Sequence, residues 1–388
     1  MSAAPAAPRG DGRGSLADST GHPVVMAAAG SVLLGSGPVQ VLTAERSDRA
    51  EWADEVLAVL AGPDGGRIGF GALSFRGDGP ARLLRPRSTS RIAQADLAPV
   101  LAAPEAYRGA LSVIEAPSGA EYGAAVAAAV ERIVGPGNLR KVVLGRWLDI
   151  LAEPAIDSRQ LLAELSRRHP GQYLFSVPLD GEAVLVGASP ELLVSRRGAS
   201  IRSTPLAGSM PRSADPDEDR RRGDALLDSA KDLAEHRYVI EAIAEALAPL
   251  CRDLEVPSAP VVISTDTMWH LASPIRGTLA AGAGSRLSAL HLAQLLHPTP
   301  AVGGSPRDAA YGVIAELEAE DRGFLTGAVG WVDADGDGDW AVTIRAGVLD
   351  GASLRLFAGA GIVADSVPAS EIAETQGKLS TMLRAVGS

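Results

Sequence analysis

The strand-like segments of this chain come in blocks, and this grouping restricts the possible folds more than any other feature. Four apolar runs bounded by turn residues form the first block, at 142–151, 173–177, 183–187 and 192–196. Three more form the second, at 327–332, 339–346 and 353–357. Parallel neighbours would need a long crossover between successive strands, so the blocks predict antiparallel strands.

Helical periodicity marks other segments, in which apolar residues recur every three or four positions. These segments are 119–134, 158–168, 222–250, 284–296, 306–320 and 368–386. An apolar run from Val24 to Leu34 is interrupted by glycine and serine, so we interpret it as a first strand that ends at a turn at Gly35–Gly37, not as a signal peptide. The pattern predicts an α+β fold, a single large domain of packed antiparallel β-sheets flanked by helices.

Length and composition agree with one large domain. The chain has 388 residues, of which 46% are hydrophobic and 21% charged, values typical of a globular protein with a sizeable core. Residues 1–21 lack apolar periodicity and are rich in Ala, Pro, Gly and Arg. We therefore expect a disordered leader over 1–21 and a folded domain over 22–388.

Charge and cysteine content exclude several functional classes. The net charge is −11 and no basic stripe is visible, which argues against nucleic-acid binding. A single cysteine, Cys251, permits no internal disulfide and no cysteine-based zinc site, which indicates a reducing, cytoplasmic setting. Histidine is scarce, so carboxylates would hold any metal ion. We expect no nucleic-acid or membrane partner and, by default, a monomer.

Two motifs resemble ligand sites that their context does not support. The loop Asp333–Asp339 has the spacing of half an EF-hand, but Ile344 stands where the bidentate glutamate is required, so we expect a hairpin turn. The glycines of Ala358–Gly361 follow a strand as in a dinucleotide fingerprint, yet no βαβ unit follows. They indicate instead a close approach of the backbone to a ligand.

Several charged residues are open to both a structural and a functional interpretation. Glu374 and Lys378 are four apart on a predicted helix, as in a solvent-exposed ion pair. Glu235 lies beside an apolar stripe, either as a helix-edge charge or as a buried metal ligand. Lys141 and Glu191 each stand at the end of a predicted strand, where an unremarkable surface charge is common.

Taken together, the motifs around these residues resemble those of the chorismate-utilising enzymes, the family of anthranilate synthase component I. The matching segments occur in the family's order and near its spacing: KVVLGR at 141–146, GASPELLV at 187–194, TPLAGSMPR at 204–212, AKDLAEH at 230–236, HPTPAVGG at 297–304, VTIRAG at 342–347, AGAGIVADSVP at 358–368 and ETQGKLSTML at 374–383. The resemblance is strong over residues 100–388 and weak before them. It implies the family's fold and chorismate as the substrate.

Within that family, the resemblance implies isochorismate synthase activity. Lys141 is similar to the lysine that activates water in isochorismate and salicylate synthases, which the ammonia-using members lack. Ala207 stands where aminodeoxychorismate synthases carry a nucleophilic lysine, which argues against a covalent route. Ala301 and Val302 are similar to the isochorismate synthases, whereas salicylate and anthranilate synthases usually carry a polar pair. The C-terminal KLSTML resembles siderophore-type enzymes.

The same resemblance implies roles in a Mg²⁺-dependent isomerisation, in which water adds at C2 of chorismate and the C4 hydroxyl leaves. Lys141 would be the general base and Glu191 the general acid. Glu235 and Glu374 would hold Mg²⁺ together with the ring carboxylate of the substrate. His270 would orient the ring carboxylate or the C4 hydroxyl, although a structural histidine in the core fits the pattern equally well.

The substrate-binding set implied by the resemblance is Gly208, Ser209, Ala301, Val302, Arg345, Gly359 and Lys378. In this set, Arg345 offers a bidentate fork to the enolpyruvyl carboxylate and Lys378 a point charge. Leu325 departs from relatives that carry an aromatic residue there, which leaves the contact with the substrate ring open. Two alternatives stay open, a salicylate synthase that goes on to eliminate pyruvate and a non-catalytic chorismate-binding paralogue; the joint presence of Lys141 and Glu191 argues against the second.

Overall fold

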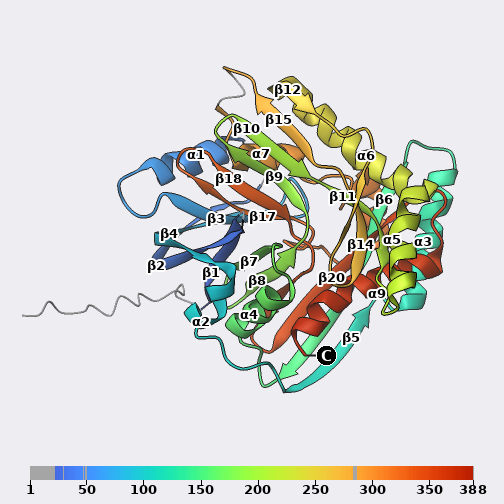
Figure 1. Ribbon diagram of the computed structural model, residues 1–388, viewed down its shortest axis with the longest axis horizontal. Helices are drawn as coiled ribbons and strands as arrows, with labels where there is room; N and C mark the ends of the chain where they lie inside the picture. Colours follow the sequence, from blue (N-terminus) through green and yellow to red (C-terminus); the bar gives the residue numbers. More distant parts are fainter. Residues whose placement is uncertain (1–21, 29, 47, 49, 283–285, 388) are drawn as a thin grey trace, which may run out of the picture.

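The computed structural model of the protein describes residues 22–28, 30–46, 48, 50–282 and 286–387. Figure 1 shows a β-rich centre with helices around its outside. The predicted leader, residues 1–21, lies outside the described residues, so the domain boundary at residue 22 stays a prediction. Within the described residues, no helix is both long and apolar enough to span a bilayer.

In the described residues, 17 strands form one sheet and three form a second, smaller sheet. Before residue 200, the large sheet contains β1 (Val24–Ala28), β2 (Ser31–Ala44), β3 (Ile68–Leu73), β4 (Ala81–Ala93), β5 (Ala110–Ala116), β6 (Lys141–Glu153), β7 (Tyr173–Pro178), β8 (Val184–Ser189) and β9 (Leu192–Arg197). From residue 200 on, it contains β10 (Ser200–Thr204), β12 (Cys251–Glu255), β15 (Ile275–Leu279), β16 (Gly304–Ser305), β17 (Ala328–Asp333), β18 (Gly338–Val342), β19 (Ala346–Asp350) and β20 (Ser353–Ile362). The small sheet contains β11 (Leu206–Pro211), β14 (Met268–Ala272) and β13 (Val261–Ser264), in that order.

Every strand pair is antiparallel. The large sheet runs β12-β15-β10-β9-β18-β17-β3-β4-β2-β1-β7-β8-β19-β20-β6-β5, and β16 also pairs with β6. The helices are α1 (Ala50–Ala61), α2 (Leu97–Val100), α3 (Gly119–Val134), α4 (Ser158–Arg168), α5 (Pro216–Asp228), α6 (Ala230–Leu247), α7 (Ala289–Leu296), α8 (Arg307–Leu317) and α9 (Pro368–Ala385).

Both faces of the large sheet are buried at its central strands, because neighbouring residues of one strand join different cores. Leu83 of β4 packs with residues of α1 and α7, while Leu84 packs into an inner core of mainly strand residues. On the other half of the sheet, Val186 of β8 packs with residues of α4 and α9, and Leu185 joins the same inner core. This two-residue alternation means that the sheet folds back on itself, with helices over both outer faces.

The structure confirms the predicted α+β fold of antiparallel strands, as well as the hairpin turn at Asp333–Asp339. That turn joins β17 to β18, and the carboxylate of Asp333 accepts hydrogen bonds from the backbone N–H groups of Asp335 and Asp337, both at 2.9 Å. The glycine motif Ala358–Gly361 lies inside β20 instead of after it.

Three predicted elements are wrong in detail. The helix expected over 222–250 is broken at Ser229, whose hydroxyl accepts from the N–H of Asp232 and caps α6. The run from Val24 to Leu34 spans two paired strands with Gly30 at φ +82° between them, and β2 continues through the expected turn. The strand expected over 339–346 stops at Val342 and resumes as β19, because Arg345 has a left-handed φ of +51°.

Candidate active site

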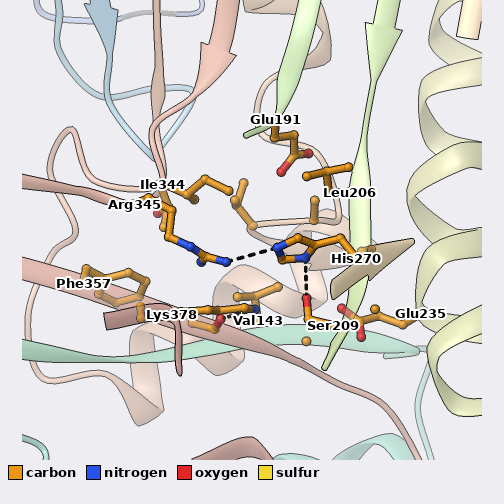
Figure 2. Close-up of a pocket in the computed structure, with 18 residues that line it drawn as sticks. Val143, Glu191, Leu206, Ser209, Glu235, His270, Ile344, Arg345, Phe357 and Lys378 are labelled. Atoms are coloured by element: carbon orange, nitrogen blue, oxygen red, sulfur yellow. Dashed lines mark hydrogen bonds between the residues drawn. The ribbon is translucent and has the colours of Figure 1, made fainter. Parts of the chain in front are cut away.

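A pocket opens where β6 and β20 of the large sheet approach β11 and β14 of the small one (Figure 2). It is lined by Val143, Glu191, Leu206, Ala207, Gly208, Ser209, Glu235, His270, Ala301, Val302, Thr326, Ile344, Arg345, Phe357, Ala358, Gly359, Gly361 and Lys378. The predicted site residues all belong to this lining except Lys141 and Glu374, and each of those two is paired with a residue that does. Segments distant in sequence thus converge on one pocket that combines charged and apolar side chains.

Lys141 and Glu235 form an ion pair behind the pocket wall. Lys141, at the start of β6, is fully buried, and its Nζ lies 3.0 Å from Oε1 of Glu235 on α6. Gly361 on the adjacent β20 makes room for this pair, since a Cβ there would lie 2.0 Å from Oε1 of Glu235 and 2.8 Å from Cε of Lys141. The close approach that the glycine motif predicts is therefore to this ion pair. Glu235 itself faces the pocket, so the helix-edge interpretation is wrong.

Glu374 and Lys378 form a second pair, on α9. Nζ of Lys378 lies 2.6 Å from Oε1 of Glu374 and donates to the carbonyl oxygen of Gly359 at 2.9 Å. Their side chains are only 8% and 17% exposed, so the solvent-exposed pair suggested by the sequence pattern is wrong. Lys378, which reaches from α9, is therefore the hydrogen-bond donor to the carbonyl oxygen of Gly359 on β20.

Sequence reasoning missed two further acids in this group. Glu371, one turn before Glu374, is fully buried and pairs with Lys231 of α6 at 2.7 Å. Burial and the charge of Glu374 raise the pKa of Glu371 to about 7. Asp232, one turn before Glu235, also has a raised pKa because it is buried. The spacing of three residues on each helix, which places both acids on one face, was the available signal.

Glu191 and Glu235 are the same residue type in the same pocket, but their acidities differ. Glu191 precedes β9 and is 2% exposed. Burial raises its pKa to about 7, against the lowering effect of a hydrogen bond from the backbone of Leu206 and of nearby cations. Burial also acts on Glu235, but the ammonium group of Lys141 and two other lysines hold its pKa below the ordinary value. The pocket therefore contains one carboxyl that keeps its proton near neutral pH and one that does not.

A short hydrogen-bonded chain links Arg345, His270 and Ser209 across the pocket (Figure 2). Nη2 of Arg345 lies 3.3 Å from Nε2 of His270, and Nδ1 of His270 lies 2.9 Å from Oγ of Ser209. Burial and the charge of Arg345 hold the pKa of His270 well below its usual range, so the ring is neutral. Because a guanidinium only donates, Nε2 accepts and Nδ1 carries the hydrogen towards Ser209. His270 therefore lines the pocket and orients Arg345.

The remaining wall of the pocket is mainly apolar, with the hydroxyl of Thr326 as a polar side-chain group among its residues. Ala301 and Val302 lie on the turn after α7, and Ile344 and Phe357, which are labelled in Figure 2, also belong to this wall. Leu325, which the sequence left open as a ring contact, is instead buried in the inner core of the sheet. Phe357 is the aromatic side chain that lines the pocket, a residue that the sequence did not identify.

The charged residues suit a hard divalent cation. Glu235 and Glu374 present buried carboxylates from two helices, and each holds a lysine ammonium group at 3.0 Å and 2.6 Å respectively, so a cation already stands beside each. Among the described residues, no three histidine, cysteine or acidic side chains form a ready-made metal site. Mg²⁺ is compatible with two protein carboxylates, because it keeps several waters and takes further oxygen ligands from a substrate.

The raised pKa of Glu191 makes stability depend on pH. The folded protein keeps a proton on Glu191 that the unfolded chain releases above about pH 4.5, so this site destabilises the fold as pH rises towards 7. We therefore compare the free energy of unfolding of Glu191→Gln with that of the wild type at two pH values. The difference in favour of the variant should be about 2 kcal/mol larger at about pH 8 than at about pH 5. Urea unfolding at both pH values measures this. Glu241→Gln, at an exposed position of α6, is the control. If Glu191→Gln differed from the wild type by the same free energy of unfolding at both pH values, the raised pKa of Glu191 would be wrong.

Three comparisons place this architecture among known proteins. The chain is 50% identical to the isochorismate synthase DhbC of Bacillus subtilis (strain 168) over 260 residues, which cover 66% of this chain and 65% of that relative. It is 42% identical to the vibriobactin-specific isochorismate synthase of Vibrio cholerae over 319 residues, 82% of this chain and 79% of the relative. The solved structure of DhbC from Bacillus anthracis superposes with a TM-score of 0.86 and 39% identity, covering 95% of this chain and 96% of that one.

The match to a described family covers most of the chain. Residues 86–387 correspond to the family described as chorismate binding enzyme. This range contains all the strands and helices that line the pocket, together with both buried ion pairs. The superposition over nearly the whole chain confirms the fold that the sequence motifs implied. The chain belongs to the family of chorismate binding enzymes.

Proposed function

We propose that this chain is an isochorismate synthase, a hydroxymutase that converts chorismate to isochorismate by adding water at C2 while the C4 hydroxyl leaves. The observation that carries the proposal is that a carboxyl which keeps its proton, Glu191, lines the same pocket behind whose wall the amine of Lys141 is buried, since the reaction needs a proton donor and a base together. The names of the relatives in Bacillus subtilis and Vibrio cholerae support the same activity.

Glu191 is the proposed general acid. Its carboxyl is buried with a pKa near 7, so it keeps a proton to give to the departing C4 hydroxyl. Lys141 is the proposed general base, which takes a proton from the attacking water. The amine of Lys141 must be neutral for that step, and its contact with Glu235 has to be released first so that its nitrogen can accept the proton of the water.

The cations of the pocket suit the two carboxylates of chorismate. Arg345 has a buried guanidinium whose Nε lacks a hydrogen-bond partner, so it has a donor left for the enolpyruvyl carboxylate. Lys378 faces the same space as a point charge, and the hydroxyl of Ser209 and the backbone at Gly208 close the opposite side. His270 is a positioning residue in this arrangement, because its ring holds Arg345.

Glu235 and Glu374 would hold Mg²⁺. The bound ion would neutralise the ring carboxylate of chorismate and withdraw electron density from the ring, which favours attack at C2. Each glutamate would then exchange its lysine ammonium group for the divalent ion, because the two cations are alternative partners of each carboxylate. This exchange would leave Lys141 and Lys378 available to water and to substrate.

The biological setting follows from the relatives and the composition. We propose a role in the biosynthesis of a siderophore or a related aryl acid, supported by the vibriobactin-specific enzyme among the relatives. The single cysteine, which permits no internal disulfide, supports a cytoplasmic location. We propose that the enzyme acts as a monomer on a small-molecule substrate, with no nucleic acid or membrane as a partner.

Product analysis tests the activity. Chorismate incubated with the protein and Mg²⁺ should yield an isomer of equal mass, and a coupled lactate dehydrogenase assay should detect no stoichiometric pyruvate. We expect this because Ala301 and Val302 offer no side-chain hydrogen bond to hold the ring in the elimination geometry. Pyruvate equal to the chorismate consumed would identify a salicylate synthase, and unchanged chorismate would identify a non-catalytic paralogue.

The acid and base roles predict two variants with similar losses. Lys141→Ala and Glu191→Gln should each lower kcat by about 10²–10⁴, the usual worth of a positioned proton transfer. In the wild type, kcat/KM should fall as pH rises above about 7, since Glu191 loses the proton that it must donate. Glu191→Gln should lack this alkaline limb in its residual activity. If ammonium efficiently replaced water and gave an amino product, the role of Lys141 would be wrong.

The metal assignment predicts loss of activity without loss of fold. Glu235→Ala and Glu374→Ala should each abolish turnover, because each removes one of only two protein carboxylates for Mg²⁺. Circular dichroism should show native secondary structure in both variants, and titration calorimetry should show weakened Mg²⁺ binding. Full turnover by the wild type in excess chelator would exclude the metal role of these glutamates.

A further inference from the structure

A further buried ion pair, unused by the chemistry above, lies behind the wall of the pocket formed by Val143, Val302 and Phe357. Arg322, between α8 and β17, and Glu318, just after α8, have side chains that are only 1% and 5% exposed. Nε and Nη2 of Arg322 donate to the two carboxylate oxygens of Glu318 at 2.8 and 2.5 Å. Neither residue lines the pocket. Burying two charges costs free energy, so the other contacts of Arg322 and Glu318 indicate which parts of the pocket wall the pair holds in place.

Those contacts run to three separate segments of the pocket wall. Nη1 of Arg322 donates to the carbonyl oxygen of Val302 and Nη2 to that of Val143, both at 2.8 Å. The guanidinium carbon lies 4.7 Å from the ring centre of Phe357, and it also lies over the ring of Phe75. One cation therefore ties together β6, the turn after α7, and β20.

Glu318 fixes the same wall from its other side. Its Oε1 accepts a hydrogen bond from the backbone N–H of Gly145 at 3.0 Å. The ring of Phe357 lies against this glycine, since a Cβ at Gly145 would be 2.1 Å from Cζ of the ring. The ion pair therefore holds the backbone of β6 at Gly145, and this backbone limits how far the ring of Phe357 can move.

The three wall residues that this ion pair contacts offer a substrate ring only packing from their side chains. The wall residues Val143, Val302 and Phe357 have no polar side-chain atom, so they orient a ring only by packing. Their relative positions depend on hydrogen bonds from Arg322 to main-chain atoms, which would be lost if that side chain changed. A small displacement of such a wall is costly to catalysis because the reacting groups no longer align.

We propose that Arg322 and Glu318 are positioning residues that determine product specificity by fixing this wall. With the wall fixed, the ring is held for water addition, and the enolpyruvyl group does not reach the geometry in which it leaves as pyruvate. The proposal deepens the proposed function and rests on it.

The test uses chorismate with the full-length wild type and with Arg322→Met, Arg322→Lys and Glu318→Gln. We measure the KM for chorismate and the ratio of pyruvate to isochorismate, because neither depends on the concentration of folded enzyme. Arg322→Met should raise both quantities and lower kcat/KM about 10²-fold. Arg322→Lys keeps the charge but not the fork of donors, so it should give a smaller change in the same direction. Glu318→Gln should also raise both quantities.

Arg196→Met is the matched control. Arg196 also has a largely buried guanidinium that pairs with an aspartate, Asp337, and donates to a carbonyl oxygen, that of Asp335, but it does not line or contact the pocket wall described here. This variant should lose stability and keep the wild-type KM and product ratio. If Arg322→Met fails to fold, Arg322→Lys and Glu318→Gln decide the question.

The outcomes separate the two proposals. Wild-type KM and product ratio in the Arg322 and Glu318 variants, with only a lower melting temperature, would overturn the positioning role and leave the isochorismate synthase activity intact. A wild type that makes no isochorismate from chorismate would instead overturn the proposed function itself. Changes in KM and product ratio of the same size in Arg196→Met would also overturn the positioning role, since they would reflect general destabilisation.

Discussion

The buried contact between Lys141 and Glu235 is the interaction on which the rest of the site depends. Two opposite charges have been removed from water, and each is tolerable there only because the other is 3.0 Å away. The contact requires a helix to approach a sheet so closely that a single methyl group at Gly361 would prevent it. It also sets the charge state of Glu235, since Lys141 is the nearest cation that lowers its pKa. The contact between Nζ of Lys141 and Oε1 of Glu235 thus determines both how closely the helix packs on the sheet and the charge of Glu235.

The folded-back sheet explains how residues so far apart in sequence meet at this pair. β6 supplies Lys141, and its neighbour β20 supplies the glycines, while α6 and α9 bring the glutamates. The interruption between β18 and β19 then turns Arg345 into the same space, at the cost of a left-handed backbone for a residue with a side chain. A regular strand at this point would point alternate side chains to the two faces of the sheet and leave the pocket without its guanidinium.

The sequence predicted the architecture better than it predicted the interruptions. Antiparallel strands and the helices at 119–134 and 158–168 follow from local periodicity, and the structure confirms them. The break at Arg345 has no local signal, since its guanidinium contacts a distant segment at His270. The cap at Ser229 does have one, because Ser229 and Asp232 form a local Ser-x-x-Asp pattern, and sequence reasoning missed it. The site residues came from a resemblance of ordered motifs, and the structure brings them to one pocket. Periodicity alone made Glu374 and Lys378 a surface pair, because it does not show that another layer covers that face of α9.

The acids of the site illustrate why burial alone does not define a catalytic role. Glu191 and Glu235 are both almost completely buried, and desolvation raises the pKa of each. The two differ in their nearest cation, since Glu235 has a lysine ammonium group at 3.0 Å while Glu191 has no ion-pair partner within 4 Å among the described residues. Removing that lysine should therefore change the acidity of Glu235 towards that of Glu191, and the pocket would then contain two proton donors, while the proposed metal site would lose one of its two carboxylate ligands. The positions of the lysines therefore decide which of the two carboxyl groups keeps its proton and which is ionised.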